Sequence, residues 1–196
     1  MLRRLVITLA AASLASCVSL LPEQEVPEGL YRFGQVETAH PLDASIIIRE
    51  PEASRLFGGR AIAAEDNRGA LRLVPGVEWT DSATRMMQIA LLDSFTSEGA
   101  GVAIGSDTGA DADYELAWRM SDFTLSGTTA RCRIQATLLE GHSRKVLAQT
   151  SVATSAVAQG NDNASRAKAL TDAGRACVSD VAAFVAEQAV APEPKS

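Results

Sequence analysis

Residues 114–120 read Tyr-Glu-Leu-Ala-Trp-Arg-Met, and this stretch decides the fold because large apolar side chains fill every second position. Successive side chains of a β-strand point to opposite faces, so the alternation predicts a strand with one apolar and one polar face. Phe123 and Leu125 continue the apolar series one residue out of step. This shift predicts a β-bulge near Ser121 and Asp122.

Two further alternating segments extend this strand into a meander. A turn at Ser126-Gly127 leads into a strand that starts near Ala130 and alternates small or aliphatic residues with arginine, glutamine and threonine. Residues 140–143 turn the chain again into a strand from Lys145 to Val157. One face of the meander is apolar, and we therefore expect other elements to cover it.

Two amphipathic helices supply this cover. Apolar residues between Ala83 and Phe95 form a stripe wide enough to pack against a sheet. Trp79 precedes this helix and is expected to staple its start to the sheet, with Thr80 or Asp81 as the N-cap. A second helix is predicted over 163–189, where apolar or small residues recur at spacings of three and four.

The first half of the body adds shorter strands. Residues 45–49 form a β-branched run that suits a central strand buried on both faces. Residues 60–65 and 70–74 flank the turn sequence 66–69 and predict a hairpin whose far end is closed by Pro75-Gly76. Together the elements predict an α+β two-layer sandwich, with a mostly antiparallel sheet and both helices on its apolar face.

Cys17 ends the run Leu14-Ala15-Ser16-Cys17, which resembles the lipobox of bacterial lipoproteins. Arg3 and Arg4 begin a signal whose apolar stretch is shorter than the ~20 residues of a membrane-spanning helix. The resemblance implies a Cys17 that carries S-diacylglycerol and N-palmitoyl chains. The alternative is ordinary signal cleavage after Ala15, which would leave Cys17 as a plain thiol.

The chain divides into a signal peptide (1–16), a lipidated cysteine and tether (17–29), one α+β domain (30–190) and a disordered tail (191–196). The tether contains prolines and glutamates without periodicity, and its extended form reaches roughly 40 Å. Val18 follows the lipidated position where an inner-membrane lipoprotein more often has Asp. This favours the outer membrane, with the domain in the periplasm, over the inner membrane.

Charge restricts the partners. The formal net charge of −6 becomes more negative once Arg3 and Arg4 are removed with the signal. A net acidic domain lacks the basic footprint of a nucleic-acid-binding protein, so we expect membrane contact through the anchor and no contact with nucleic acid.

Spaced motifs across the body resemble the auxiliary lipoproteins of ABC-type transporters. They are the residues after the tether, the apolar run with the proline and leucine behind it, the hairpin, and a Trp-x-Asp helix start with a glutamine and a leucine in the helix. In this chain they are Tyr31-Arg32-Phe33, Ile46-Ile47-Ile48, Pro51, Leu56, Trp79-Thr80-Asp81, Gln88 and Leu92. The hairpin, Ala-Ala-Glu-Asp-Asn, is less apolar than the family pattern leads us to expect.

The resemblance implies a non-enzymatic component of an envelope lipid-transport system. Its partners would be a periplasmic mammalian-cell-entry (MCE) domain protein with its ABC permease and ATPase, and it would dock that conduit to the outer membrane. Two other classes stay open: a structural or regulatory lipoprotein, such as an assembly factor or an activator of cell-wall synthesis, and a periplasmic hydrolase. A homo-oligomer built on strand edges or the polar sheet face is a further candidate.

Catalytic, cofactor and metal sites find little support. The only histidines, His40 and His142, lie beside Pro41 and Gly141 in turn-like sequences, so a Ser-His-acid triad has few components. A Ser-x-x-Lys match at 165–168 is better explained as a helix start, and the glycine-rich run 99–105 follows a helix instead of opening one.

The acidic residues after this glycine run lack the spacing of an EF-hand, and we interpret them as a solvated loop. They are Asp107, Asp111, Asp113 and Glu115.

Cys132 and Cys177 are predicted on the apolar side of a strand and on the buried stripe of the last helix. In an oxidising compartment such a pair can form a disulfide, which would contribute about 3–4 kcal/mol on the loop-entropy model. The alternative is two small core residues that never meet, because a shared core does not ensure the required Cα separation of roughly 4.4–6.8 Å.

Overall fold

The computed structural model describes residues 26–34, 36, 39–96 and 98–191. Cys17 and most of the tether therefore lie outside the described residues, as does nearly all of the predicted tail. None of the described helices is both long and apolar enough to cross a membrane. In chain order the elements are β1 (Gly29–Tyr31), β2 (His40–Pro41), β3 (Ile46–Ile48), β4 (Glu52–Ala53), α2 (Arg55–Gly58), β5 (Ala61–Glu65), β6 (Leu71–Trp79), α3 (Ala83–Leu92), β7 (Phe95–Thr96), β8 (Ala103–Gly105), the 3₁₀ turn η2 (Ser106–Thr108), β9 (Tyr114–Ser126), β10 (Thr129–Glu140), β11 (Val146–Val157) and α4 (Asn163–Gln188).

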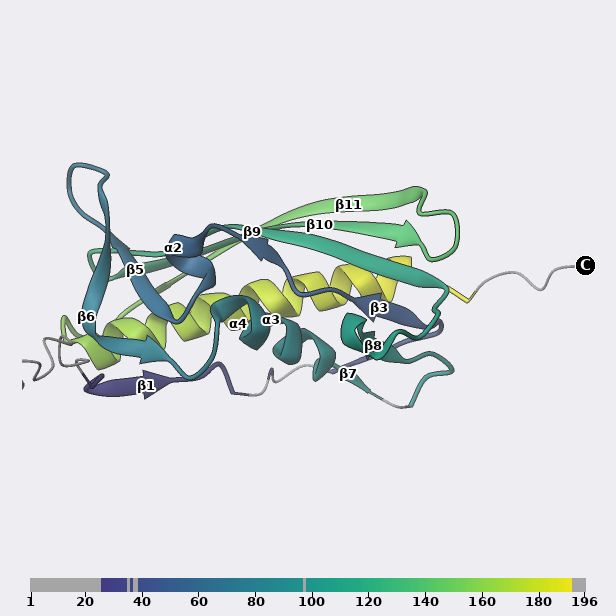
Figure 1. Ribbon diagram of the computed structural model, residues 1–196, viewed down its shortest axis with the longest axis horizontal. Helices are drawn as coiled ribbons and strands as arrows, with labels where there is room; N and C mark the ends of the chain where they lie inside the picture. Colours follow the sequence, from purple (N-terminus) through teal and green to yellow (C-terminus); the bar gives the residue numbers. More distant parts are fainter. Residues whose placement is uncertain (1–25, 35, 37–38, 97, 192–196) are drawn as a thin grey trace, which may run out of the picture.

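The meander β9–β10–β11 has the predicted order and forms one side of the molecule (Figure 1). Met120 pairs with Ile134 and Asp122 with Arg133, so Ser121 is the extra residue of the predicted bulge. Gly127 turns β9 into β10 with φ of 61°, a left-handed value that glycine adopts without a steric penalty. The alternation along residues 114–120 thus fixes both the strand and its register.

The main sheet is mixed, not mostly antiparallel. Its principal strand order is β1-β6-β5-β9-β10-β11, and β3 and β4 also pair with β9. Among the described residues six strand pairings are parallel and three, the longest, are antiparallel. The expectation of a mostly antiparallel sheet was wrong because β3, β4 and β5 each pair with β9 in parallel orientation. Alternation in a sequence carries no information about that direction.

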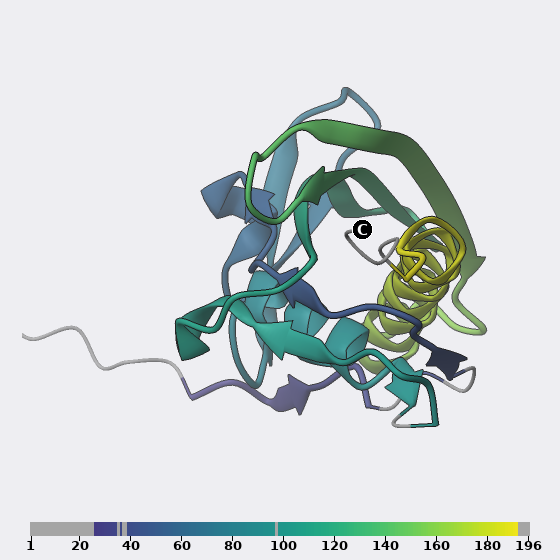
Figure 2. The same ribbon diagram turned by 90° about the vertical axis from the view of Figure 1, so that its right-hand side faces the viewer.

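The sheet also curls, so a flat two-layer arrangement does not describe it (Figure 2). α4 packs along β9, β10 and β11 inside the curl, whereas α3 packs against β3, β8 and α4. Both helices begin where the sequence predicted them, and α4 ends within one residue of the expected position. α3 ends at Leu92, and Phe95 belongs instead to the short strand β7.

The early strands also follow the sequence. Ile46 and Ile48 are fully buried, and β3 lies between β8 and β9 as a central strand should. The β5–β6 hairpin turns at the predicted residues, but Pro75-Gly76 does not close β6. Gly76 has φ of 74° within β6, and the pairing with β5 is irregular here. A proline without an N–H and a left-handed glycine fit such an irregularity, so the strand continues to Trp79.

Candidate functional site

Three aromatic rings join the N-terminal segment, the hairpin and the meander. Trp79 stacks on Phe123 with ring centroids 5.7 Å apart, and Phe33 meets both rings edge-on at 5.6 and 5.7 Å. Trp79 is fully buried, and its backbone N–H donates to the backbone carbonyl of Arg60 at 2.7 Å. Trp79 thus holds the start of α3 to the sheet, which is the structural role expected from the sequence.

The cap of α3 differs from the expectation. Ser82 is the N-cap, and its hydroxyl accepts the backbone N–H of Arg85 at 3.2 Å. Asp81 instead accepts the N–H of Ser82 at 2.7 Å, one residue before the helix. Thr80 donates its hydroxyl to the sulfur of Met86 at 3.7 Å. Asp81 therefore lies at the helix start as predicted but does not cap it, because α3 begins at Ala83 and Ser82 is the residue directly before it.

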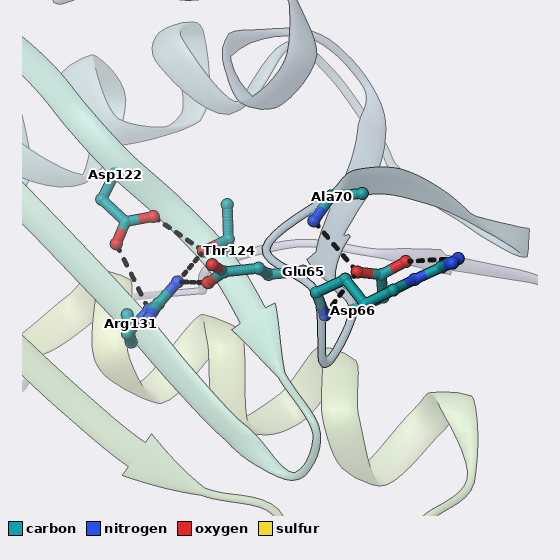
Figure 3. A network of polar contacts seen from close by, with 7 residues as sticks. Glu65, Asp66, Ala70, Asp122, Thr124 and Arg131 are labelled. Atoms are coloured by element: carbon teal, nitrogen blue, oxygen red, sulfur yellow. Dashed lines mark hydrogen bonds and ion pairs between the residues drawn. The ribbon is translucent and has the colours of Figure 1, made fainter.

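The β5–β6 hairpin projects from the body and is held by a polar network at the end of β5 that leads into its turn (Figure 3). Arg131 of β10 donates to Glu65 of β5 and lies 3.3 Å from Asp122 of β9. It also contacts the hydroxyl of Thr124 at 3.2 Å, which in turn donates to Asp122 at 2.7 Å. One guanidinium thus joins three strands, and it lies where β5 runs parallel to the end of β9.

The turn of the hairpin has its own local lock. Asp66 accepts the backbone N–H groups of Arg68 at 2.9 Å and Ala70 at 3.0 Å. These two bonds, that from Ala70 first, lower the pKa of Asp66 below its ordinary value, and nearby Arg72 adds to the effect. The carboxylate accepts backbone N–H groups that have no strand partner in the turn, and it thereby stabilises the turn conformation.

A hollow of about 690 Å³ lies between the base of this hairpin and the first described residues. Val26 and Pro27 line one side, and Leu73 to Glu78 line much of the other. Leu73 is 55% exposed and Leu71, two residues earlier on the same strand, is 41% exposed. We call Val26, Pro27, Leu71, Leu73 and Pro75 the hairpin surface. It is an exposed apolar area at the end of the domain that the tether reaches.

The two predicted core cysteines do meet. Cys132 of β10 and Cys177 of α4 are buried, free thiols that are hydrogen-bonded to each other. Burial raises the pKa of Cys132, and the bond to Cys177 raises it further. Thr154 of β11 donates to the carbonyl of Ala173 at 2.7 Å and lies 3.2 Å from the sulfur of Cys177. The fold thus brings the pair into contact at the junction of helix and sheet.

Two of the four acidic residues considered for calcium are engaged in close structural contacts. Asp113 accepts both the hydroxyl of Ser45 at 2.6 Å and its N–H at 3.0 Å, and the hydroxyl bond is the main cause of a lowered pKa at Asp113. Glu115 is 6% exposed and pairs with Arg49 and Arg144. Within the described ranges no group of three metal-ligating side chains occurs.

The other motifs also have structural partners. Ser165 donates its hydroxyl to Asp162, the N-cap of α4, at 2.7 Å, and Lys168 pairs with Asp172 at 2.7 Å. A Cβ added at Gly99 or Gly101 would lie 2.0 or 2.1 Å from a backbone oxygen of residues 42–44. These glycines permit a close backbone approach. They do not end α3, which stops at Leu92 with Asp93 as its C-cap, and β8 begins within the glycine-rich run at Ala103.

The fold is shared with solved structures. A protein from Xanthomonas campestris superposes with a TM-score of 0.70 at 19% identity, covering 82% of this chain and 96% of its own. A second, described only as an uncharacterized protein, gives 0.61 at 9% identity over 81% and 99%. None of the curated proteins matches in sequence. At these identities the likeness shows a common fold and no more.

The family follows from the sequence. The family model for the ABC-type transport auxiliary lipoprotein component matches residues 33–182, most of the chain and nearly all of its α/β body. The protein therefore belongs to this family of auxiliary lipoproteins of ABC-type transport. The resemblance seen in the spaced motifs is confirmed, and so is the assignment to a class of envelope lipoproteins.

Proposed function

We propose that this protein is a non-enzymatic component of an MCE-type envelope transport system and docks a periplasmic lipid conduit to the outer membrane. Its membership of the auxiliary lipoprotein family carries the proposal. The side chains of Asp113, Glu115, Ser165 and Lys168, which lie in the motifs considered for metal binding or catalysis, make structural hydrogen bonds and ion pairs. These contacts agree with a non-enzymatic role. The cargo would move through the partner, and this domain would hold the partner in place.

The tether orients the domain. Val26 lies nine positions after Cys17, and a fully extended chain of that length spans at most roughly 30 Å. Val26 itself lines the hollow at the hairpin base. The hairpin surface therefore stays within a few tens of ångströms of the anchoring bilayer, whereas the far end of α4 is held farther away (Figure 1).

We assign contact with the MCE-domain protein to the hairpin surface. A conduit that docks to a membrane must end at that membrane, so contact at the membrane-proximal end of the anchored domain would hold it there, and this end exposes Leu71 and Leu73. Interface cores favour apolar side chains that a rigid frame presents to the partner, and the Arg131 network supplies the frame. The arrangement is that of a tethered domain with a stiff docking hairpin.

Photocrosslinking in intact cells tests this assignment. A photoreactive residue at Leu73 should capture an MCE-domain protein, and the same probe at exposed Glu187, near the end of α4, should not. Capture of only cell-wall synthases or outer-membrane assembly proteins would favour the regulatory alternative and overturn the proposal. Equal capture from both positions would support the MCE-domain partner but would contradict the assignment of the contact to the hairpin surface.

The anchor is tested separately. Cys17→Ser should release a folded domain from the membrane and abolish transport-dependent phenotypes, because docking requires both the anchor and the partner surface. A released variant that still supports transport fully would show that docking to the membrane is not the function.

A further inference from the structure

The strand β11 leaves an unusually bare edge. In the described part of the chain it pairs with β10 alone, so its other edge presents free backbone N–H and C=O groups along twelve residues. Between residues 146 and 157 the sequence contains no charged residue, no proline and no glycine. Natural edge strands are normally blunted by lysine, proline, bulges or short length, because an open edge is a template for another strand.

The opposite side of the same sheet has this protection. β1 is three residues long, and the β6 it borders carries Arg72, Pro75 and Glu78. β6 is also interrupted at Gly76. The molecule therefore protects one border of its sheet and leaves the other long, neutral and continuous. Such a contrast within one sheet indicates that the β11 edge is paired in the working protein.

The sequence of β11 indicates what pairs with it. Read outward from Val152 in both directions, residues of the same kind occur at equal distances. The pairs are Ser151 with Ala153, Thr150 with Thr154, Gln149 with Ser155, Ala148 with Ala156, and Leu147 with Val157. An antiparallel strand pairs residues at equal distances from the centre, so this near-palindrome suits pairing with itself.

We propose that β11 pairs antiparallel with β11 of a second copy of this chain, with Val152 opposite Val152 of that copy. The two-fold axis would run perpendicular to the sheet, so equivalent faces of the two copies would lie on the same side of the joined sheet. Each cross-strand pair would then match in kind, with Thr150 opposite Thr154 and Leu147 opposite Val157 of the second copy.

Burial along the strand agrees with this register. Leu147 and Val157 are 46% and 63% exposed in the single chain, and in the dimer they cover each other. Val152 faces α4 and is 8% exposed. A register shifted by one step of two residues would place Leu147 opposite Ser155 or Val152 opposite Thr154 of the second copy. No charge lies on the strand, so two copies can approach without like-charge repulsion.

A second copy fits better than an unrelated strand. An unrelated strand added to the sheet edge would pair through its backbone. Such pairing would not explain the near-palindromic sequence of β11. Self-pairing uses both the bare edge and the symmetric sequence. The inference does not depend on the proposed transport function, because it concerns the edge opposite to the hairpin side of the sheet.

Disulfide trapping in native membranes tests the register. In the full-length lipoprotein, Gln149→Cys combined with Ser155→Cys places two thiols directly opposite each other across the dimer. Their Cα separation would be roughly 4.5–5.5 Å, within the range of a disulfide. Within one chain these positions are roughly 20 Å apart, so they cannot join to each other.

The controls fix the reading of this experiment. Each single variant, and Gln135→Cys on the same face of β10, should give at least tenfold less covalent dimer than the double variant. Covalent dimer from Q149C alone at the level of the double variant would overturn the register. A double variant that keeps the parental melting temperature and gives no dimer would overturn the self-pairing itself.

A charge exchange tests the same pairing without thiols. Ser151→Lys with Ala153→Lys clusters lysines at the dimer centre, and Ser151→Asp with Ala153→Asp clusters carboxylates there. Each should abolish copurification of two differently tagged full-length copies. Coexpression of one copy of each kind should restore it, because lysine then opposes aspartate. Failure of the mixed pair, with both copies folded by circular dichroism, would contradict the proposal.

Discussion

Arg131 of β10 donates to Glu65 of β5 across the strand that separates them, so one ion pair fixes the projecting hairpin to the meander (Figure 3). Arg131 is 40% and Glu65 is 26% exposed, which leaves the pair only partly screened by water. The contact joins residues that are 66 positions apart in the sequence. It ties the projecting hairpin to the body, which would reduce the cost of ordering the hairpin in its proposed docking role.

Replacing Arg131 by methionine should loosen this hairpin. The change leaves Glu65 facing Asp122 without a cation, and we expect a loss of about 1 kcal/mol because partly exposed pairs contribute modestly. Amide hydrogen exchange in β5 should become faster while that of α4 is unchanged. Arg133→Met, two residues along on the same strand and exposed, is the matched control. Equal exchange in both variants would show that the network does not hold the hairpin.

Gly174→Ala should destabilise the protein although alanine is the better helix former. A Cβ at this position of α4 would lie 2.9 Å from Phe33 and 3.2 Å from Phe123, so the aromatic cluster would have to move. We expect a loss of about 1–3 kcal/mol from overpacking, measured as a lower urea midpoint.

The exposed neighbour supplies the opposite control. Ala176→Gly removes a methyl group from the solvent side of the same helix and should cost about 1 kcal/mol through helix propensity alone. A higher urea midpoint for G174A would contradict the close packing of α4 against the rings of Phe33 and Phe123.

Asp113→Asn should weaken the junction of the loop at Ser45 with the start of β9. The pKa of Asp113 is lowered in the folded state, so its contribution is present above the unfolded value of about 3.9 and is lost as the pH falls through the folded pKa. At neutral pH we expect a loss of about 1–2 kcal/mol, since the carboxylate accepts two bonds from Ser45.

The pH dependence distinguishes charge from shape. The difference in unfolding free energy between parent and D113N should narrow at pH 3 relative to pH 7, in urea titrations at both values. Asp111→Asn, on an exposed neighbour, should show little change at either pH. A difference that stays constant down to pH 3 would mean that the ionised form of Asp113 contributes nothing.

Cys132 and Cys177 should form a disulfide when the protein is exported to an oxidising compartment. The fold places the two thiols in hydrogen-bond contact, which removes the main objection that the sequence left open. Protein isolated without reductant should resist alkylation after unfolding, and reduction should cost about 3–4 kcal/mol of stability. Recovery of both thiols alkylated from such material would identify a reduced core pair.

The sequence indicated most of the secondary structure because it depends on local patterns. The alternation of residues 114–120, the spacing of apolar residues in α4 and the turn at 66–69 each appear within one segment. Ser82 as the cap of α3 was missed because Thr80, Asp81 and Ser82 all have side chains that can cap a helix. The structure identifies Ser82 as the cap, because its hydroxyl accepts the backbone N–H of Arg85.

The features on which the two proposals rest were harder to find. The hollow at the hairpin base depends on the path of residues 26–28, which no pattern in β6 reveals. The near-palindrome around Val152 was readable in the sequence. It gained a meaning only when β11 proved to be the outermost strand.

By itself the sequence showed a run at Cys17 that resembles a lipobox, the strands and helices of one acidic α/β domain, and the family. Each of these features depends on residue types at short spacings along the chain, so it can be found without knowing the tertiary contacts. Only the tertiary structure decided that β3, β4 and β5 run parallel to β9, that Cys132 meets Cys177, and that Arg131 holds the hairpin. These contacts join residues far apart along the chain, and the packing of the whole core selects them because each buries its side chains in only one arrangement.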